Sequence, residues 1–424
     1  MNEIKPTKSI GVPTPLVDGP EKVSGKAQYS ADFMPSDYLV GRIFRSPVSH
    51  AEIIDVDISA AQALPGVKAV ITGDETDETF GILPVARFEY PLARDKVRYK
   101  GEPVACVAAV DVETAQKAVD LIKFKYKELP AYFTSQEAMA EGAVNIHDHR
   151  ERNIEREVDY DLGEVDEGFE AADLVMEETF NCAEVAQSQM EPHAAIAEYD
   201  PTRDFMTIHA STQVPYYGHL MLAKVLKMEE SQIRMIKPFV GGGFGCRTEC
   251  LNVELICALA ARAAGGTVRI VISREETFIT HRGRPETDVE MKIGLTKDGV
   301  ITAVDFKAIQ RGGAFSGYGI VTILYAGGMV FGLYDLPAVR YKGLRVLTNT
   351  PPCGAMRGHG VTNVRYAFES LLEKMANELS IDPIEIRRRN LLLGPKYETL
   401  NEMFINSYGL PECLDWVEKA SDWK

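Results

Sequence analysis

The sequence has no long apolar run, and it carries little positive charge for its length. Within its 424 residues, no apolar stretch is long enough to span a bilayer. The first residues, Met1 to Pro6, lack the apolar core of a signal peptide, so we expect a cytoplasmic protein. With 62 acidic residues against 46 basic ones, the net charge is −16. The phosphates of a nucleic acid would be repelled, so we expect neither a nucleic-acid partner nor a membrane.

Cysteine is scarce and scattered. The chain has seven cysteines, an odd number, and only Cys246 and Cys250 lie close together, with no second pair to complete a metal site. We therefore expect no iron–sulfur cluster or structural zinc held by this chain alone, and no metal-ligating residue among its candidate sites. If the protein performs redox chemistry, electrons must reach it through another cofactor or another subunit.

The common nucleotide-binding fingerprints are missing as well. A dinucleotide-binding G-x-G-x-x-G would need a further glycine where Cys246 or Thr248 stands, and no G-x-x-x-x-G-K-[ST] occurs anywhere. A plain nucleotide-binding protein is therefore disfavoured.

What the sequence does have is an unusual glycine loop between a strand and a helix. A strand is expected over 233–240, followed by Gly241-Gly-Gly-Phe-Gly245 and a buried helix over about 249–264, which Gly265 ends. Such a loop can present backbone N–H groups to an anion or an oxo group. The alternative is a tight turn without a ligand, and from the loop alone both interpretations stay open.

The order of predicted elements indicates a mixed α/β, or α+β, fold. Residues 1–131 alternate strands with short helices and predict a smaller α/β domain. Residues 132–172 are rich in charge and are expected to form a long connection. Residues 173–424 are denser in strands and end in amphipathic helices, the longest of them over 361–379. We expect them to form a larger mixed domain.

Several phrases of the sequence occur together in one enzyme family. They are Arg45-Ser-Pro-Val-Ser-His50, Met190-Glu-Pro-His193, Thr212-Gln213, the glycine loop and Cys353-Gly-Ala-Met-Arg-Gly-His-Gly360. The chain resembles the molybdenum-cofactor subunit of the xanthine dehydrogenase/aldehyde oxidase family. Within that family it is similar to the large subunit of the 4-hydroxybenzoyl-CoA reductase branch, on phrases such as Tyr90-Pro-Leu-Ala-Arg-Asp-Lys-Val-Arg98 and Asn349-Thr-Pro-Pro-Cys353. The resemblance covers essentially the whole chain, and it implies a hammerhead-like N-terminal domain followed by a first molybdopterin-binding domain.

The resemblance places cofactor-binding roles on individual residues. Gln213 stands where the family's glutamine donates to a ligand of the molybdenum, which suits a neutral amide. Gly242, Gly243, Phe244 and Gly245 belong to the loop that packs over the pterin. Arg357 matches the family's arginine beside the cofactor and is a candidate catalytic residue as well. Taken alone, Gln213 and Arg357 read as ordinary surface residues.

The substrate side differs from that of xanthine-type enzymes. These carry a glutamate where Thr248 stands and an arginine where Tyr325 stands, so a purine substrate is disfavoured. The resemblance implies that Tyr325 is a substrate-binding residue and a catalytic proton donor, although a buried core tyrosine is an equal alternative from sequence. His359 occupies the position of an aromatic residue that stacks on substrate. A structural histidine is the alternative there.

The resemblance also implies partners. The family's second molybdopterin-binding half carries the catalytic base, and we expect it on a second polypeptide, with a fragment of a longer chain as the other possibility. The expected cofactor is molybdenum-molybdopterin in a dinucleotide form, and iron–sulfur clusters and FAD are expected on an iron–sulfur subunit and a flavin subunit.

The primary functional hypothesis is a molybdenum oxidoreductase that removes the hydroxyl group of 4-hydroxybenzoyl-CoA or a related aromatic compound. The first alternative is a hydroxylase of an N-heterocycle or an aldehyde. The second, from another class, is a non-catalytic scaffold or fragment.

Overall fold

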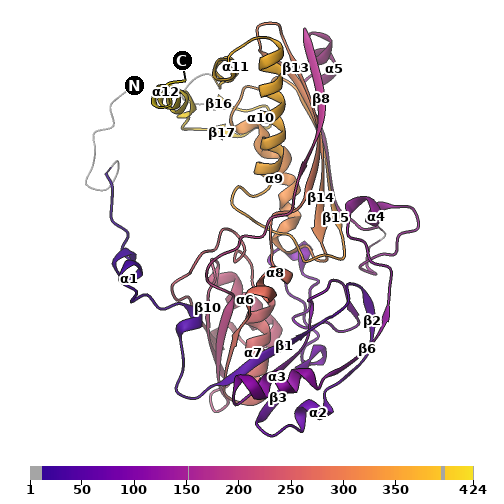
Figure 1. Cartoon of the computed structure of the whole chain (residues 1–424), viewed down its shortest axis with the longest axis vertical. Coiled ribbons are helices and arrows are strands. Elements are labelled where there is room, and N and C mark those ends of the chain that lie inside the picture. The colour runs from indigo at the N-terminus through magenta and orange to yellow at the C-terminus, as the bar shows by residue number, and fades with distance from the viewer. Residues whose placement is uncertain (1–11, 151, 393–396, 424) are drawn as a thin grey trace.

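The computed structural model describes residues 12–150, 152–392 and 397–423 (Figure 1). The first eleven residues of the expected N-terminal domain, residues 151 and 393–396, and Lys424 lie outside these ranges. The mixed α/β class expected from the sequence is confirmed, because two large mixed sheets are each packed against helices. No helix within the described ranges is both long and apolar enough to cross a bilayer.

The first large sheet has seven strands and combines distant parts of the chain. Three of its neighbouring strands come from the first 110 residues, and the other four come from residues 194–271. Its strands, in spatial order, are β11 (Ile233–Ile236), β10 (Phe205–Ala210), β9 (Ala194–Asp200), β12 (Thr267–Val271), β1 (Leu39–Arg45), β5 (Pro103–Ala109) and β3 (Val67–Thr72). The β1–β12 pairing is parallel and joins the two parts directly.

Four helices and a small sheet complete this half of the molecule. The buried helix α7 packs on β9 and β12, where Leu255, Ile256 and Leu259 are almost fully buried. Its end at Ala264 agrees with the prediction, because Gly265 takes the left-handed conformation that glycine accepts without strain. The helices are α2 (Ser59–Gln62), α3 (Val112–Asp120), α6 (Pro215–Leu226) and α7 (Asn252–Ala264), and the small sheet consists of β4 (Lys96–Val97), β2 (Ala51–Asp57) and β6 (Lys123–Glu128).

The second large sheet has five strands and a separate apolar core. The long helix α10 lies against β13 and β8, and its residues Phe368, Leu371 and Leu372 are fully buried. The strands in order are β7 (Ile154–Leu162), β15 (Val339–Leu347), β14 (Ile301–Gly313), β13 (Thr287–Leu295) and β8 (Leu174–Cys182). The helices around it are α5 (Val165–Glu170), α9 (Thr322–Gly328), α10 (Val361–Glu378) and α11 (Pro383–Arg389).

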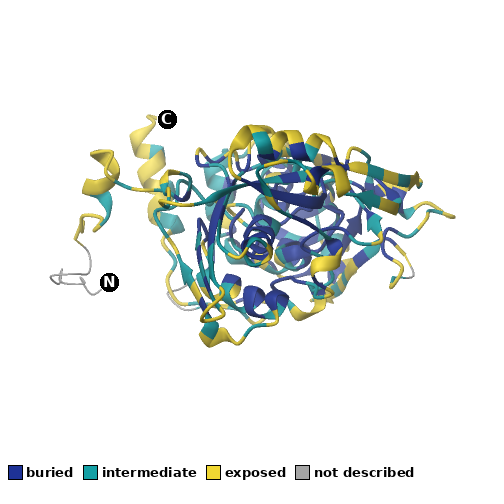
Figure 2. Ribbon diagram, turned by 90° about the horizontal axis from the view of Figure 1, so that it is seen from below, coloured by how far each residue is buried: buried dark blue, intermediate teal, exposed yellow. Residues whose placement is uncertain are grey.

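The remaining elements are short or lie at the periphery. Figure 2 shows the buried residues gathered inside the body, whereas the helix beside the C-terminus is largely exposed. That helix, α12, has no buried residue. The remaining elements are α1 (Gly19–Val23), α4 (Ser135–Met139), α8 (Arg274–Ile279), β16 (Tyr397–Glu398), β17 (Phe404–Ile405) and α12 (Leu410–Ala420).

Two expectations need correction. The stretch 132–172 is not simply a connection, because it contains α4, β7 and α5. Strand β7 is not predicted from the sequence, because it is an edge strand with charged side chains on its exposed face. The strand before the glycine loop ends at Ile236 rather than Val240, since Pro238 has no N–H to donate to a ladder.

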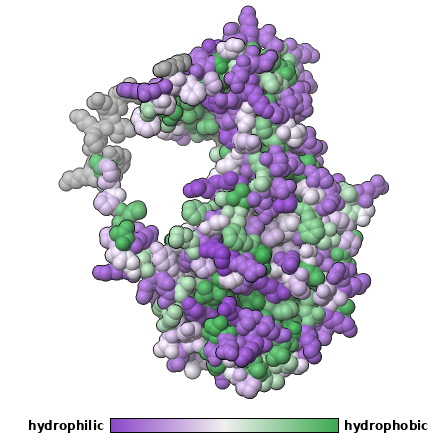
Figure 3. Space-filling view, in the orientation of Figure 1, coloured by the Kyte–Doolittle hydropathy of each residue, from purple (hydrophilic) through white to green (hydrophobic). Residues whose placement is uncertain are grey.

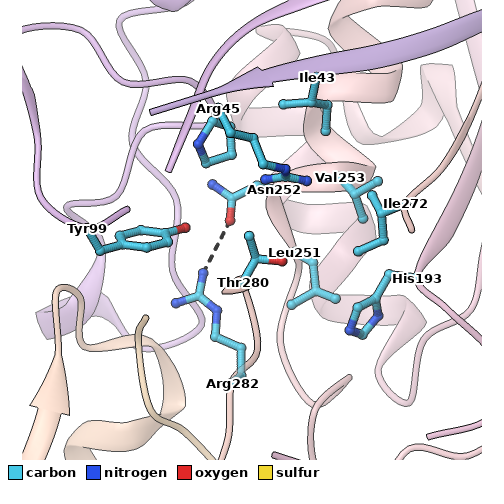
Figure 4. Close-up of a pocket in the computed structure, with 11 residues that line it drawn as sticks. Ile43, Arg45, Tyr99, His193, Leu251, Asn252, Val253, Ile272, Thr280 and Arg282 are labelled. Carbon is cyan, nitrogen blue, oxygen red and sulfur yellow. Dashed lines mark hydrogen bonds between the residues drawn. The ribbon is translucent and has the colours of Figure 1, made fainter. Parts of the chain in front are cut away.

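A buried ion pair joins the N-terminal part of the chain to the rest. Arg282 Nη2 lies 2.8 Å from both carboxylate oxygens of Glu89 and 3.3 Å from Asn252 Oδ1. Figure 4 shows Arg282 beside a cavity of about 20 Å³, room for about one water molecule, between Tyr99 and His193. Glu89 and Arg282 are each less than 5% exposed, so bulk water cannot replace either partner.

We expect Glu89→Gln to lower the free energy of unfolding by about 3–5 kcal/mol, because the Arg282 guanidinium would stay buried without its carboxylate. Chemical denaturation of the two proteins measures the difference. Glu113→Gln is the matched control, since it removes a carboxylate that pairs with Lys117 at the exposed surface of α3 and should change little. Equal losses in the two variants would contradict the structural role of the buried pair.

Candidate functional site

The glycine loop is held in place by one buried ion pair. Arg247 Nη1 donates to Glu191 Oε2 at 2.6 Å, and both side chains are almost fully buried. The same carboxylate accepts hydrogen bonds from the Gly241 N–H at 2.7 Å and from the Ser211 hydroxyl at 2.6 Å. Its other oxygen accepts from the Ser30 N–H at 3.3 Å. The start of the loop, the end of β10 and the N-terminal segment therefore meet at one carboxylate.

The tip of the loop contacts Gln213. The backbone N–H of Gly245 donates to Gln213 Oε1 at 3.1 Å, and the backbone N–H of Gln213 donates to the Arg247 carbonyl at 2.9 Å. Because the amide oxygen is used by the loop, the amide NH₂ of this exposed side chain remains as a donor. The site therefore presents a neutral, fixed donor group to solvent.

An added Cβ would meet close neighbours at two positions of the loop. A Cβ added to Gly243 would lie 2.5 Å from Gln213 Oε1 and 2.6 Å from its Cδ. A Cβ on Gly245 would lie 2.4 Å from the Ala355 carbonyl oxygen, and the positive φ of +105° would strain any other residue. Phe244 between them also has a positive φ, of +52°, and its side chain is 44% exposed. The glycines allow close backbone approach rather than a simple turn.

A large cavity lies on one side of the loop. It has a volume of about 760 Å³ and is lined by Gly241, Gly242, Phe244 and the segment 187–192, together with residues of the N-terminal segment. At its wall, Gln187 donates to the carbonyls of Arg282 and Ala355, which fixes the orientation of its amide. Gln187 Oε1 is buried and has no donor among the described residues. A ligand with N–H groups could satisfy it.

Arg357 lies directly over the loop. Its backbone N–H donates to the Phe244 carbonyl at 2.9 Å, and its guanidinium is 5.4 Å from the centre of the Phe244 ring. The side chain is exposed. This contact joins two predicted site residues that are far apart in the sequence.

Three aromatic side chains form a second group beside Arg357. The ring of His359 lies 5.2 Å from that of Tyr325 and 5.1 Å from that of Tyr318, measured between centroids. His359 Nε2 is 2.8 Å from the Thr322 hydroxyl oxygen. Tyr325 lies on α9 and is 41% exposed, which excludes the buried core alternative for it.

Two residues of this aromatic group, His359 and Tyr318, have shifted pKa values. Burial, with a smaller contribution from Arg345, lowers the pKa of His359 to about 4. Burial and the neighbouring Tyr325, which shares a hydrogen bond, raise the pKa of Tyr318. At neutral pH His359 and Tyr318 are therefore uncharged.

The structure thus brings the predicted residues into two adjoining groups. Gln213, Gly242–Gly245 and Arg357 contact one another, and Tyr325 contacts His359, which follows Arg357 by two residues. Thr248 does not face outward for a substrate, because its hydroxyl donates to the Gly245 carbonyl at 2.7 Å. Within the parts of the chain that the structure describes, no three His, Cys, Asp or Glu side chains gather as a metal site.

Sequence reasoning missed several residues of this site. Glu191 belonged to a recognised phrase and Arg247 follows the loop directly, but nothing in their spacing of 56 residues signalled a pair. Gln187 and Tyr318 carry no motif of their own. Only the fold places them beside the loop and His359.

Comparison with known proteins identifies the two parts of the chain. Residues 146–391 match the family described as the molybdopterin cofactor-binding domain. Residues 24–130 match the aldehyde oxidase and xanthine dehydrogenase a/b hammerhead domain.

Among curated relatives, the nicotinate dehydrogenase large molybdopterin subunit of Eubacterium barkeri is 36% identical, covering 95% of this chain and 94% of the relative. The xanthine dehydrogenase molybdenum-binding subunit of Escherichia coli O157:H7 is 31% identical over 96% of this chain and 55% of its own length. In the structure of quinoline 2-oxidoreductase from Pseudomonas putida 86, a chain with 30% identity superimposes with a TM-score of 0.91, over 98% of this chain and 55% of that one. The chain thus spans nearly all of the first relative and about half the length of the other two.

We expect His359 to titrate near pH 4, well below the ordinary value of 6.5, because burial disfavours its charged form. Between these values the unfolded chain binds a proton that the folded chain does not, so acidification from pH 6.5 to 4 should reduce stability through His359. Histidine-selective NMR, with His359→Gln to assign the resonance, measures the pKa. A value of 6.5 or above would show that the ring is not buried as described.

Proposed function

We propose that this chain, which belongs to the aldehyde oxidase and xanthine dehydrogenase family, is the molybdopterin-binding large subunit of a molybdenum hydroxylase acting on an N-heteroaromatic compound. Members of this family are molybdenum oxidoreductases, and the match of residues 146–391 to its cofactor-binding domain assigns molybdopterin to this chain. The substrate class, the roles of single residues and the partner subunits are parts of the proposal.

The observation that carries the proposal is the hydrogen bond from the Gly245 N–H to Gln213 Oε1. It orients the Gln213 amide so that its NH₂ group faces outward beside the glycine loop, where a Cβ at residue 243 would displace the Gln213 side chain. A donor without charge, set on a loop that a ligand can approach closely, suits a metal ligand that accepts hydrogen bonds.

The cavity residues also fit a pterin. Gln187 Oε1 is a buried acceptor without a donor, and the cavity beside Gly242 and Phe244 is of the size that cofactors occupy. In the proposal, Gln213, Gly242, Gly243, Phe244, Gly245 and Arg357 hold the cofactor, here in a dinucleotide form. When bound, the cofactor supplies a two-electron redox centre.

Tyr325 and His359 would form the substrate side. Their rings make an uncharged, partly exposed surface next to Arg357, which suits a flat aromatic molecule. His359 would stack on the substrate, and the Tyr325 hydroxyl and Arg357 would hold its polar atoms. Thr248 is hydrogen-bonded to the loop and offers no carboxylate to a purine, so a pyridine-like ring is the better fit.

The comparisons favour hydroxylation over the reductive dehydroxylation that was our primary hypothesis. The named relatives are a nicotinate dehydrogenase, a xanthine dehydrogenase and a quinoline 2-oxidoreductase, whose names all refer to N-heteroaromatic compounds. The narrower similarity to 4-hydroxybenzoyl-CoA reductase finds no support among them. We therefore adopt the hydroxylase, which was the first alternative.

Partner subunits would complete the site. Gln213, Phe244 and Arg357 are exposed in this chain, although a redox site needs shelter from water. The N-terminal segment, at the left of Figure 3, is also exposed, with Leu16, Val17 and Val23 at least 73% accessible. We propose that a second molybdopterin-binding chain covers the site and supplies the base, and that iron–sulfur and flavin subunits carry electrons in the cytoplasm. Within this chain we retain residues 1–131 as the first domain, and we extend the second, 173–424, to include β7 (Ile154–Leu162), which pairs in the five-stranded sheet.

The proposal predicts that tagged chain purified from its host carries molybdenum and a second, base-bearing chain. The complex should reduce an artificial electron acceptor when nicotinate or quinoline is added. Reduction of 4-hydroxybenzoyl-CoA by the dithionite-reduced complex, without activity on the N-heterocycles, would restore the reductase hypothesis. A metal-free, solitary and inactive chain would instead support the scaffold or fragment alternative.

A second prediction concerns the loop itself. Gly243→Ala should lower the molybdenum content of the purified complex about tenfold or more, because the added Cβ displaces Gln213, whose contact holds the loop. Gly266→Ala is the matched control, since a Cβ there meets no atom within 4 Å. Metal analysis measures the loss of molybdenum, and thermal unfolding measures any loss of stability, so the two effects can be separated. If the Gly243→Ala complex keeps its full molybdenum content, Gln213 and the loop do not hold the cofactor.

A further inference from the structure

Two arginines meet beside the glycine loop without a carboxylate. Arg284 Nη2 donates to the backbone carbonyl of Arg357 at 2.6 Å. Burial and the nearby charge of Arg357 lower the pKa of Arg284. In contrast to Arg247 and Arg282, neither Arg284 nor Arg357 forms an ion pair among residues 12–150, 152–392 and 397–423. Two neighbouring positive charges are thus left uncompensated in a chain whose net charge is −16.

The acidic residues that follow Arg284 in the chain, and the one beside its bridge partner Val185, are already engaged. Glu286 lies 3.1 Å from Arg311, and Glu184 accepts from both His281 and Arg311. Asp288 accepts from Asn181 at 2.7 Å and from Gln136 at 3.1 Å. None of these carboxylates can turn to Arg284 without leaving a partner unsatisfied.

Hydrogen-bond donors around the two arginines also lack acceptors. Arg284 Nε is buried and has no acceptor in the described part of the chain, and the same holds for the Thr362 hydroxyl, which lies beside Gly358. Arg357 Cζ lies 5.4 Å from the centre of the Phe244 ring, and its guanidinium makes no hydrogen bond with residues 12–150, 152–392 or 397–423. The 18-residue helix α10 begins at Val361, so the positive end of its dipole points to the same place.

A purely structural role for Arg284 accounts for only part of these unpaired charges and donors. Bracing the loop through the Arg357 carbonyl uses one N–H of one guanidinium. It leaves the buried Nε, the Thr362 hydroxyl and the charge of Arg357 unexplained. An oxyanion would compensate the charge of Arg357 and offer acceptors to the neighbouring donors, since guanidinium groups bind carboxylate and phosphate oxygens through paired hydrogen bonds.

We propose that Arg284 and Arg357, with Thr362 at the start of α10, form an oxyanion-binding site at the edge of the candidate active site. The shared ligand chemistry is a pair of anionic oxygens. They could belong to the carboxylate of a small aromatic acid whose ring lies toward His359, or to a phosphate of the pterin cofactor. If the ligand is the aromatic acid, the inference rests on the proposed function and narrows its substrates to anionic ones.

The test is calorimetric titration of the purified full-length chain at low salt with sodium benzoate, benzamide and pyrophosphate. Benzamide has the size of benzoate but no charge. We expect one of the two anions to bind and benzamide not to bind. We expect Arg284→Met and Arg357→Met each to lower the affinity for that anion about tenfold or more. Arg284→Lys should lie between wild type and Arg284→Met, because it keeps the charge but not the paired donors.

Arg203→Met is the matched control, since Arg203 lies in an exposed turn and pairs with Asp200. It should bind as the wild type does. If Arg284→Met does not fold, Arg357→Met and Arg284→Lys carry the test, because the Arg357 side chain is exposed. Circular dichroism of each variant confirms folding.

The outcomes separate the two sources of the anion. If benzoate binds, and both arginine variants bind it more weakly, the site is assigned to a substrate carboxylate. Binding of pyrophosphate alone, weakened in the same way, assigns it to a cofactor phosphate. Absence of both, or unchanged affinity in Arg357→Met, overturns the site. Because the titration needs neither molybdenum nor a partner chain, its result does not depend on whether the hydroxylase assay succeeds.

Discussion

The buried pair of Glu191 and Arg247 is the interaction on which the site depends. Removing two charges from water is costly, and it is tolerated here because the carboxylate has four donors and Arg247 also binds the carbonyl of Glu191 at 2.7 Å. These partners belong to the N-terminal segment, the end of β10 and the glycine loop. A shift of any one of them would leave a charge unsatisfied, so the pair fixes all three relative to one another.

From that anchor the site extends outward and becomes steadily more exposed. The loop contacts Gln213, Phe244 contacts Arg357, and two residues later His359 lies between Tyr318 and Tyr325. The inner part is held in place by the buried Glu191–Arg247 pair and its hydrogen bonds. The outer part presents an amide, a guanidinium and aromatic rings to solvent. One wall of a site is therefore preorganised in this chain, and a covering partner would exclude water from it.

Charge is distributed unevenly between the site and the rest of the chain. The chain has a large excess of acidic residues, and the buried Arg247, Arg282 and Arg345 are each paired with a carboxylate. Arg284 and Arg357 have no such partner in the described part of the chain, and aromatic rings lie beside them. Local positive charge within an acidic protein selects small anions while nucleic acid is still repelled. The same acidic background would lower non-specific binding of anions elsewhere on the surface.

The sequence by itself determined the features that depend on local chemistry. The glycine loop, the buried helix α7 with its stop at Gly265, the long helix α10 and the family to which the chain belongs could all be predicted, because each depends on contiguous residues. Only the tertiary structure decided which polar groups meet. Glu191 and Arg247 are 56 residues apart and Glu89 and Arg282 are 193 apart, and no periodicity signals such pairs. The same holds for Gln187, Tyr318 and Arg284, whose partners are set by how the two sheets bring distant strand ends together. Strand β7 was missed for a related reason: its charged face resembles a connection until β15 pairs with it.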